Sequence, residues 1–119
     1  MTRDDFDAFC ATLAATSHVV QWGGSSVWKV GGKVFAVHNN WGDRTGAVTL
    51  KPTEMAAEVW RGAEGVALAP YLGRAGWLQI ADGAMEDDEL RSMIAASHAI
   101  NAAKLSKAKQ RELGLIKTP

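Results

Sequence analysis

Two adjacent glycines at positions 31 and 32 separate two runs of β-branched and aromatic residues, 27–30 and 33–38. A two-residue turn between antiparallel strands needs positive φ at both of its central residues, and glycine adopts that conformation without steric cost. The pattern therefore predicts a β-hairpin over residues 27–38. Short strands joined by such tight turns favour an antiparallel sheet.

Further β-rich segments surround this hairpin. Gly23-Gly24 interrupts one of them and indicates a second turn. Within 33–38, both alternating sets of side chains contain apolar residues, which is typical of a central strand with a covered face. The remaining strands are predicted at residues 18–22, 47–51, 66–70 and 77–81.

Apolar residues at helical spacing predict a helix near each end of the chain. A stripe follows the N-cap candidate Thr2 and predicts a helix over 3–15. The stripe consists of Phe6, Phe9, Cys10 and Leu13. The last helix is predicted to begin near Glu86 and to run towards Leu105, and Gly114 would end any helix that continues that far.

A third, shorter helix is predicted to open at Pro52, because proline is tolerated in the first turn of a helix. Met55, Val59 and Trp60 would give this helix a short apolar face. Gly62 is expected to stop it.

The order of these elements predicts an α+β fold, with an antiparallel β-sheet and with the N-terminal and C-terminal helices packed on one side of it. The 119 residues fit one domain over 1–119 and suffice for a hydrophobic core. The longest apolar runs are too short to span a membrane. The N-terminus lacks a signal pattern, and the one cysteine cannot form an internal disulfide, so we expect a cytoplasmic protein.

Charge is distributed unevenly although the net charge is zero. Residues 91–117 contain six bases and one acid, which makes the C-terminal segment, about 104–119, basic. This segment is either a solvated helix end whose charges match the helix dipole or an arm that contacts phosphates.

Four segments, in order along the chain, resemble the YjbR/MmcQ family of small bacterial proteins. They are residues 30–36 (VGGKVFA), residues 48–52 (VTLKP), Ala69-Pro70-Tyr71 followed by residues 77–80 (WLQI), and residues 90–105. The chain departs from the family at Glu86, where a proline is usual, and at His98, where a tyrosine is usual.

The resemblance implies a fold similar to that of the bacterial frataxin homologue CyaY. It also implies DNA binding through a double-wing arrangement of hairpins. The frataxin-like fold further suggests an acidic iron-binding surface, for which residues 86–89 are the candidates. Successive helical residues point in different directions, however, so these four acids cannot all converge on one ion, and we expect no metal site there. An acidic-surface metal binder is the third and least favoured alternative function.

Lysines beside the Gly31-Gly32 turn make this hairpin a candidate wing for phosphate contact. Binding through it would be weak, low in sequence specificity and sensitive to salt. The same lysines can instead serve only to keep the hairpin soluble and protect the sheet edge. The candidate nucleic-acid-binding residues are Lys29, Lys33, Lys51, Arg74, Lys104 and Lys107.

Trp41 stands in a polar loop and is the tryptophan that the sequence favours as an exposed partner contact. It supports an alternative function, a protein-interaction module that uses the sheet face and this loop. The other tryptophans are expected to pack in the core or against the sheet.

The remaining sequence patterns favour structural roles over catalytic or ligand-binding ones. Cys10 lies on an apolar stripe, and the three histidines lack the spacing of metal ligands. The glycine-rich stretches lack the sequences of nucleotide-binding loops. We therefore expect a monomeric, non-enzymatic binding module without a cofactor, whose partner is DNA or a protein.

Overall fold

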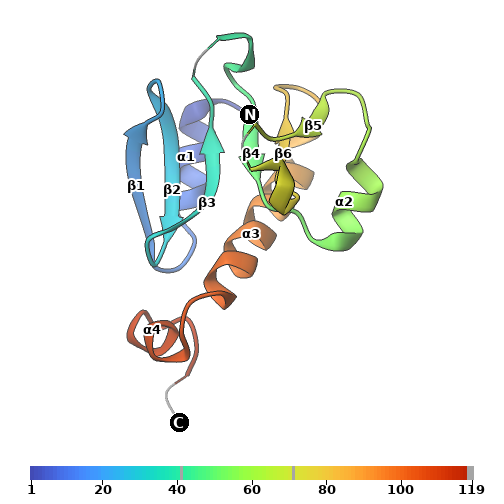
Figure 1. Ribbon diagram of the computed structural model, residues 1–119. Helices are drawn as coiled ribbons and strands as arrows, with labels where there is room; N and C mark the ends of the chain where they lie inside the picture. The colour runs from blue at the N-terminus through green and yellow to red at the C-terminus, as the bar shows by residue number, and fades with distance from the viewer. Residues whose placement is uncertain (41, 71, 118–119) are drawn as a thin grey trace.

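The computed structural model describes residues 1–40, 42–70 and 72–117. Within these residues the chain forms one six-stranded sheet with helices packed on it (Figure 1). The elements are α1 (Arg3–Ala11), β1 (Thr16–Gln21), β2 (Ser25–Val30), β3 (Lys33–His38), the 3₁₀ turn η1 (Gly42–Arg44), β4 (Val48–Leu50), α2 (Glu54–Trp60), β5 (Val66–Leu68), the 3₁₀ turn η2 (Gly73–Ala75), β6 (Leu78–Ile80), α3 (Asp87–Ala103) and α4 (Lys107–Glu112).

The sheet has the strand order β1-β2-β3-β4-β6-β5, and every neighbouring pair is antiparallel. The predicted hairpin is confirmed: Gly31 and Gly32 join β2 to β3 with φ values of 56° and 86°. The register between these strands shifts at Trp28 and Lys29, where a bulge interrupts the pairing. The bulge explains why both Phe35 and Ala36 are fully buried although they are adjacent on one strand.

Helices α1 and α3 lie on the same face of the sheet (Figure 1). The Phe6 ring of α1 is 5.3 Å from the His38 ring of β3, measured between centroids. From α3, the Ser97 hydroxyl donates a hydrogen bond of 2.6 Å to the carbonyl of Phe35. The α+β fold with the N-terminal and C-terminal helices on one side is thereby confirmed.

A single cluster of buried apolar side chains fills the space between the sheet and these two helices. Phe6, Phe35, Leu50, Ile80 and Ile94 are among the largest of its members that are almost wholly inaccessible to solvent. Burying each such side chain contributes about 1.5–3 kcal/mol, so this layer dominates the stability of the fold.

Helix α1 is shorter than its apolar stripe predicts. It ends at Ala11, with Thr12 as the C-cap, and Ala15 follows with a φ of 58°. Leu13 nevertheless packs against the core from outside the helix. The apolar stripe therefore predicts correctly which residues pack in the core, but the helix predicted from it is too long.

The short helix buries only part of the apolar face expected for it. Helix α2 begins after Thr53, whose hydroxyl accepts a hydrogen bond from the Ala56 amide, rather than at Pro52. Met55 and Val59 are 78% and 67% exposed. Helix α2 is only seven residues long: Ala57 is buried and Trp60 packs against the core, while Met55 and Val59 face solvent.

The basic C-terminal segment forms a separate helix instead of extending α3. Lys104 is the C-cap of α3, and the hydroxyl of Ser106 caps α4 by accepting from the Lys109 amide. Buried Gln110 donates a hydrogen bond of 2.8 Å to the carbonyl of Leu105 and so closes the connection between the two helices. Gly114, with a φ of 73°, follows the end of α4 as predicted.

Candidate nucleic-acid interface and a pocket on the open sheet face

The β2–β3 turn lies directly against the connection between α3 and α4. A Cβ atom added to Gly31 would be 2.6 Å from Leu105 Cδ1 and 3.0 Å from Leu113 Cδ1. Glycine is therefore required at position 31 for two reasons, the positive φ and the close approach of these leucines. Figure 1 shows this turn beside α4, although more than seventy residues separate them in the sequence.

This packing brings two groups of predicted basic residues to one end of the sheet. Lys33 is exposed at the start of β3, and Lys29 is half-buried on β2. Lys104 and Lys107 are exposed around the connection that packs on Gly31. We call these four lysines the hairpin-end lysines.

Acids are sparse in the C-terminal part of this surface. Glu112 of α4 is paired with Lys109, with 3.7 Å between the charged atoms. Both partners are well exposed, so this ion pair contributes little to stability. Because it neutralises Lys109 rather than a hairpin-end lysine, the positive charge of those four residues is left in place.

Lys51 and Arg74 form a second basic pair at the same end of the sheet. Lys51 follows β4, whose last residue Leu50 is paired with Ala36 of the hairpin, and Arg74 lies in η2 just before β6. The ammonium of Lys51 donates a hydrogen bond to the carbonyl of Ala75, which ties it to the η2 turn. Arg74 is exposed.

Asp87, one of the four acidic residues at 86–89, pairs with the N-terminus of the chain. The amino group of Met1 lies 3.3 Å from Asp82 Oδ1 and 3.4 Å from Asp87 Oδ1. Burial lowers the pKa of this amino group, but its hydrogen bonds to Asp82 and Asp87 and their charges outweigh that effect and raise the pKa. Within residues 1–40, 42–70 and 72–117, no group of three or more His, Cys, Asp or Glu side chains is placed to hold a metal ion.

A partly buried polar cluster links α1 to the first hairpin, and sequence reasoning missed it. The Ser26 hydroxyl donates a hydrogen bond of 2.5 Å to Asp7 Oδ1, and Trp28 Nε1 donates one of 2.9 Å to the same oxygen. His18 Nε2 lies 2.7 Å from Ser26 Oγ. Asp7, His18 and Ser26 are the residue types of a catalytic triad, but their hydrogen bonds are arranged differently.

In a catalytic triad the carboxylate orients the histidine, and the histidine takes the serine proton. Here the proton of Ser26 is directed at Asp7 instead, so His18 Nε2 must be the donor to Ser26 Oγ. Ser26 is also 0% exposed, which keeps any substrate away from its oxygen. The cluster therefore holds α1 on β2. No local sequence pattern predicts the contact between Asp7 and Ser26, because nineteen residues separate them.

Cys10 is buried in the core, and the two remaining histidines contact backbone carbonyls. Cys10 is fully buried, and burial, reinforced by the charge of Asp7, strongly raises the pKa of its thiol. His38 Nε2 lies 3.2 Å from the carbonyl oxygen of Met1, and His98 Nε2 lies 2.8 Å from that of Ala14. Each imidazole joins two segments that are distant in the sequence.

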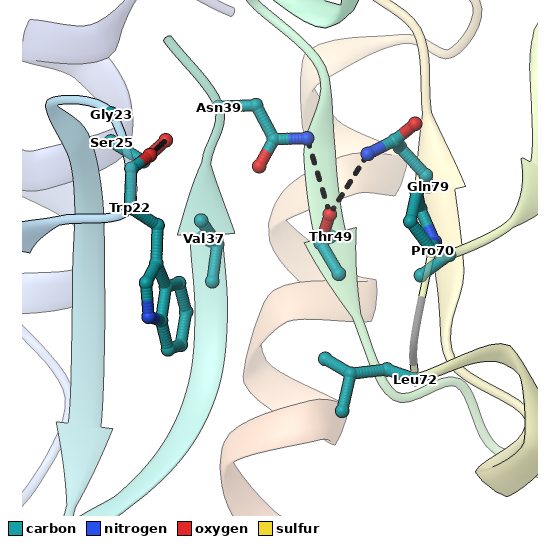
Figure 2. A pocket seen from close by; sticks show the side chains of 10 residues that line it. Trp22, Gly23, Ser25, Val37, Asn39, Thr49, Pro70, Leu72 and Gln79 are labelled. Carbon is teal, nitrogen blue, oxygen red and sulfur yellow. Dashed lines mark hydrogen bonds between the residues drawn. The ribbon is translucent and has the colours of Figure 1, made fainter. Parts of the chain in front are cut away.

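The sheet face opposite α1 and α3, which we call the open face, carries a continuous row of side chains. Strand registers align Val27, Val37, Thr49 and Gln79 across β2, β3, β4 and β6. All four are buried. A pocket of about 620 Å³ lies over this row, and Figure 2 shows it between Trp22 on one side and Leu72 on the other.

Three neutral polar side chains form the floor of this pocket. Asn39 Nδ2 and Gln79 Nε2 lie 3.4 Å and 3.5 Å from Thr49 Oγ1, drawn as dashed lines in Figure 2. Arg44 Nη1 donates to Gln79 Oε1, which fixes the orientation of that carboxamide. The rest of the lining is largely apolar and includes Val37, Ala69, Pro70 and Leu72.

Trp22 is an exposed tryptophan that sequence reasoning did not single out. It is 52% exposed and has a φ of 53°, a conformation that is unusual for a bulky residue. Its position directly before Gly23-Gly24 was the sequence feature that could have indicated its exposure. It places Trp22 in the turn, where the two glycines also have left-handed φ values of 76° and 88°. The predicted contact residue Trp41 lies outside the described residues, whereas Trp28 and Trp77 are buried as expected.

No helix in the described part of the chain is long and apolar enough to cross a membrane. No protein with curated annotation matches the chain in sequence. Solved structures that share the fold include the following two. Protein DR2400 of Deinococcus radiodurans, whose domain is described as DUF419, is 24% identical with a TM-score of 0.84, and the match covers 99% of this chain and 91% of that one.

The second structure, a protein from Pseudomonas syringae, is 18% identical with a TM-score of 0.66, and the match covers 85% of this chain and 99% of that one. At these identities the two likenesses show the fold alone. The model of the YjbR family matches residues 11–100, which is most of the chain and includes the Gly31-Gly32 hairpin. The resemblance found in the sequence is thereby confirmed, and the chain belongs to the YjbR family.

Proposed function

We propose that this chain is a non-catalytic nucleic-acid-binding module that contacts DNA phosphates through the hairpin-end lysines. The observation that carries this proposal is the packing of Gly31 against Leu105 and Leu113, which joins the lysines of the hairpin to those of the C-terminal segment. Lysines on a fixed hairpin and a docked helix lose less freedom on binding than lysines on a loose tail.

The charge available sets the strength of this interaction. Each phosphate that a lysine neutralises releases condensed counterions, and the slope of log K against log salt is about −0.9 per contact on duplex DNA. Four hairpin-end lysines therefore allow a slope of about −3 to −4. Such binding is weak, depends little on sequence and falls steeply as salt rises.

The experiment is a fluorescence-anisotropy titration of labelled double-stranded and single-stranded DNA at low and physiological salt. Lys33→Glu and the double variant Lys29→Glu/Lys33→Glu test the hairpin. Arg61→Glu is the matched control, since it changes the charge by the same amount at an exposed residue beyond α2. We expect salt-sensitive binding that Lys33→Glu weakens and Arg61→Glu preserves. Flat salt dependence, or equal losses in the two variants, would contradict the proposal.

The proposed absence of catalysis is supported by the burial of Ser26, whose neighbours otherwise suggest a nucleophile. A cytoplasmic location is part of the same proposal, because buried Cys10 is a free thiol and suits a reducing compartment.

A second candidate function, protein interaction, is favoured by the exposed Met55 and Val59 on one side of α2. Apolar residues of this size that lie together on a surface are typical of contact sites. Binding to a partner protein that survives high salt and is lost in Met55→Ala/Val59→Ala would favour this candidate over the phosphate interface.

A further inference from the structure

We propose that the pocket on the open sheet face receives an unpaired nucleobase, which stacks on the Trp22 indole and is bound at its edge by the carboxamides of Asn39 and Gln79. This inference deepens the proposed function and rests on it for the source of the base, a single strand of nucleic acid. It adds a direct base contact to an interface that otherwise holds phosphates alone.

The size and lining of the pocket suit a flat, neutral group. Its volume of about 620 Å³ falls in the range of small-ligand sites, roughly 300–1,000 Å³. None of the described residues that line it carries a charge. A charged ligand would lose its hydration there without compensation, whereas an uncharged heterocycle with polar edges would not.

Trp22 is held where it is at a conformational cost. Its left-handed backbone costs about 1–2 kcal/mol for a residue with a side chain. Buried Ser25 stabilises this conformation, because its hydroxyl donates a hydrogen bond of 2.9 Å to the Trp22 carbonyl and accepts one of 3.1 Å from the Asn40 amide. Arg3 adds a hydrogen bond of 2.7 Å to the carbonyl of Gly24.

These contacts keep a large aromatic ring beside the pocket instead of in the core. Strained residues persist when their surroundings over-determine them, and they gather at binding sites. Aromatic rings that lie free at a surface are the usual stacking platforms for the bases of single strands.

The carboxamide NH₂ groups on the floor of the pocket make only long hydrogen bonds to Thr49. Both carboxamides reach the one hydroxyl of Thr49, at 3.4 Å and 3.5 Å, beyond the usual length of about 2.7–3.2 Å. The Asn39 carboxamide offers a donor and an acceptor side by side, which matches the adjacent donor and acceptor on the edge of a base. Gln79 contributes its Nε2 donor, because its Oε1 accepts from Arg44. A base in the pocket would therefore replace two weak hydrogen bonds with shorter ones.

The pocket is also connected to basic side chains. Thr49 on its floor is two residues before Lys51, and Leu72 on its wall is two residues before Arg74. Two residues along β4 span about 6.6 Å, and two residues of the 3₁₀ turn η2 span about 4 Å. A nucleotide whose base occupies the pocket would thus have cationic groups within reach of its phosphate.

The experiment compares three ligands on the whole chain: a labelled single-stranded oligonucleotide, an abasic oligonucleotide with the same number of phosphates, and free nucleosides. Anisotropy measures binding of the two strands. Chemical shifts of Thr49 and of the Gln79 side-chain amide measure binding of the nucleosides. The variant Trp22→Gly removes the ring and keeps the fold, because glycine adopts a φ of 53° without strain.

Two further variants serve as controls. Trp22→Tyr keeps an aromatic ring and should retain most of the binding. Val20→Ala alters another exposed apolar residue of the same hairpin, 55% exposed, whose partner Ser26 lies on the side of α1. We expect the natural strand to bind about tenfold more tightly than the abasic one, and Trp22→Gly to remove that advantage while Val20→Ala leaves it unchanged.

The outcomes separate this inference from the proposed function. Equal binding of natural and abasic strands, with no effect of Trp22→Gly, overturns the pocket inference and leaves phosphate binding in place. Nucleoside-dependent shifts at Thr49 and Gln79 without binding of any strand support the pocket and overturn the proposed function. If neither strands nor nucleosides bind, both are overturned.

Discussion

Gly31 packs so closely against Leu105 that a Cβ atom on the glycine would lie 2.6 Å from Leu105 Cδ1. The contact joins the turn of the central hairpin to the start of the C-terminal segment. It is also the contact that assembles the hairpin-end lysines, so the stability of this region and the proposed DNA binding depend on the same residue.

Gly31→Ala is expected to destabilise the protein more than Gly32→Ala. Both positions have positive φ, which costs about 1–2 kcal/mol for alanine. At Gly32, however, a Cβ meets no atom within 4 Å, whereas at Gly31 it collides with two leucines. Urea denaturation should show a difference of about 1 kcal/mol or more between the variants. If they are equally stable, the packing of α4 on the turn is not tight.

Gly31→Ala should also expose the C-terminal segment to proteolysis. Displacement of Leu105 would loosen the connection that contains Lys104 and Lys107. Limited trypsin digestion should therefore cleave there faster than in the wild-type protein, while Gly32→Ala should resemble the wild type. Equal cleavage rates in all three proteins would contradict this expectation.

Ser97→Ala is expected to cost about 1–3 kcal/mol of unfolding free energy. The Ser97 hydroxyl donates to the carbonyl of Phe35 at 2.6 Å and accepts from the amide of Lys51 at 2.9 Å, and the side chain is fully buried. Alanine would leave both backbone groups without this partner. Thermal or chemical denaturation measures the effect, and Ser92→Ala, at an exposed position of the same helix, is the control with an expected change below about 0.5 kcal/mol.

Asp7→Ala is expected to be more destabilising than Asp4→Ala on the same helix. Asp7 accepts hydrogen bonds from Ser26 and from the indole of Trp28, and hydrogen bonds to a charged group contribute about 1.5–3 kcal/mol. Asp4 is exposed and interacts with the helix dipole, which contributes about 0.3–1 kcal/mol. Comparable losses in the two variants would show that the Asp7 cluster does not hold α1 on the sheet.

Cys10 should resist thiol reagents in the native protein. Burial raises the pKa of its thiol, so little reactive thiolate forms at pH 8. Labelling by a maleimide or a disulfide reagent should become rapid only in denaturant. Fast labelling of the folded protein at pH 8 would mean that α1 opens locally.

The same pKa shift has a consequence for stability at alkaline pH. In the unfolded chain the thiol ionises near its ordinary pKa of about 8.5, while in the folded protein it remains protonated. Its contribution is therefore fully present below that pH and is lost as the pH rises towards the folded-state pKa. Cys10→Ala should reduce the fall in unfolding free energy between pH 8 and pH 10, and an unchanged slope would count against this assignment.

Local patterns were sufficient to predict most of the sheet. The Gly31-Gly32 hairpin, the strand at 33–38 and the antiparallel arrangement follow from the φ requirement of the turn and from β-rich runs, both of which act within a few residues. Helix α2 shows the limit of such patterns. Apolar spacing identified the helix and its apolar face, but it did not show that only Trp60 of that face packs against the core while Met55 and Val59 face solvent.

The candidate site was predicted only in part, because its residues are brought together by tertiary contacts. The lysines beside the hairpin turn were evident from sequence, but their assembly with Lys104 and Lys107 required the packing of α4 on Gly31. The pocket on the open face had no sequence signal, since Thr49 and Gln79 become neighbours only through the pairing of β4 with β6.

By itself, the sequence determined the turns, the strands, the two long helical segments and the family resemblance. These depend on backbone conformational preferences and on the alternation of apolar residues, which are local properties. The tertiary structure decided where the helices end, which apolar residues remain exposed, and that Trp22 stands beside a pocket in a left-handed conformation. Those outcomes depend on packing and hydrogen bonds between segments that are distant in the sequence, as between Ser25 and Asn40 or between Ser97 and Phe35.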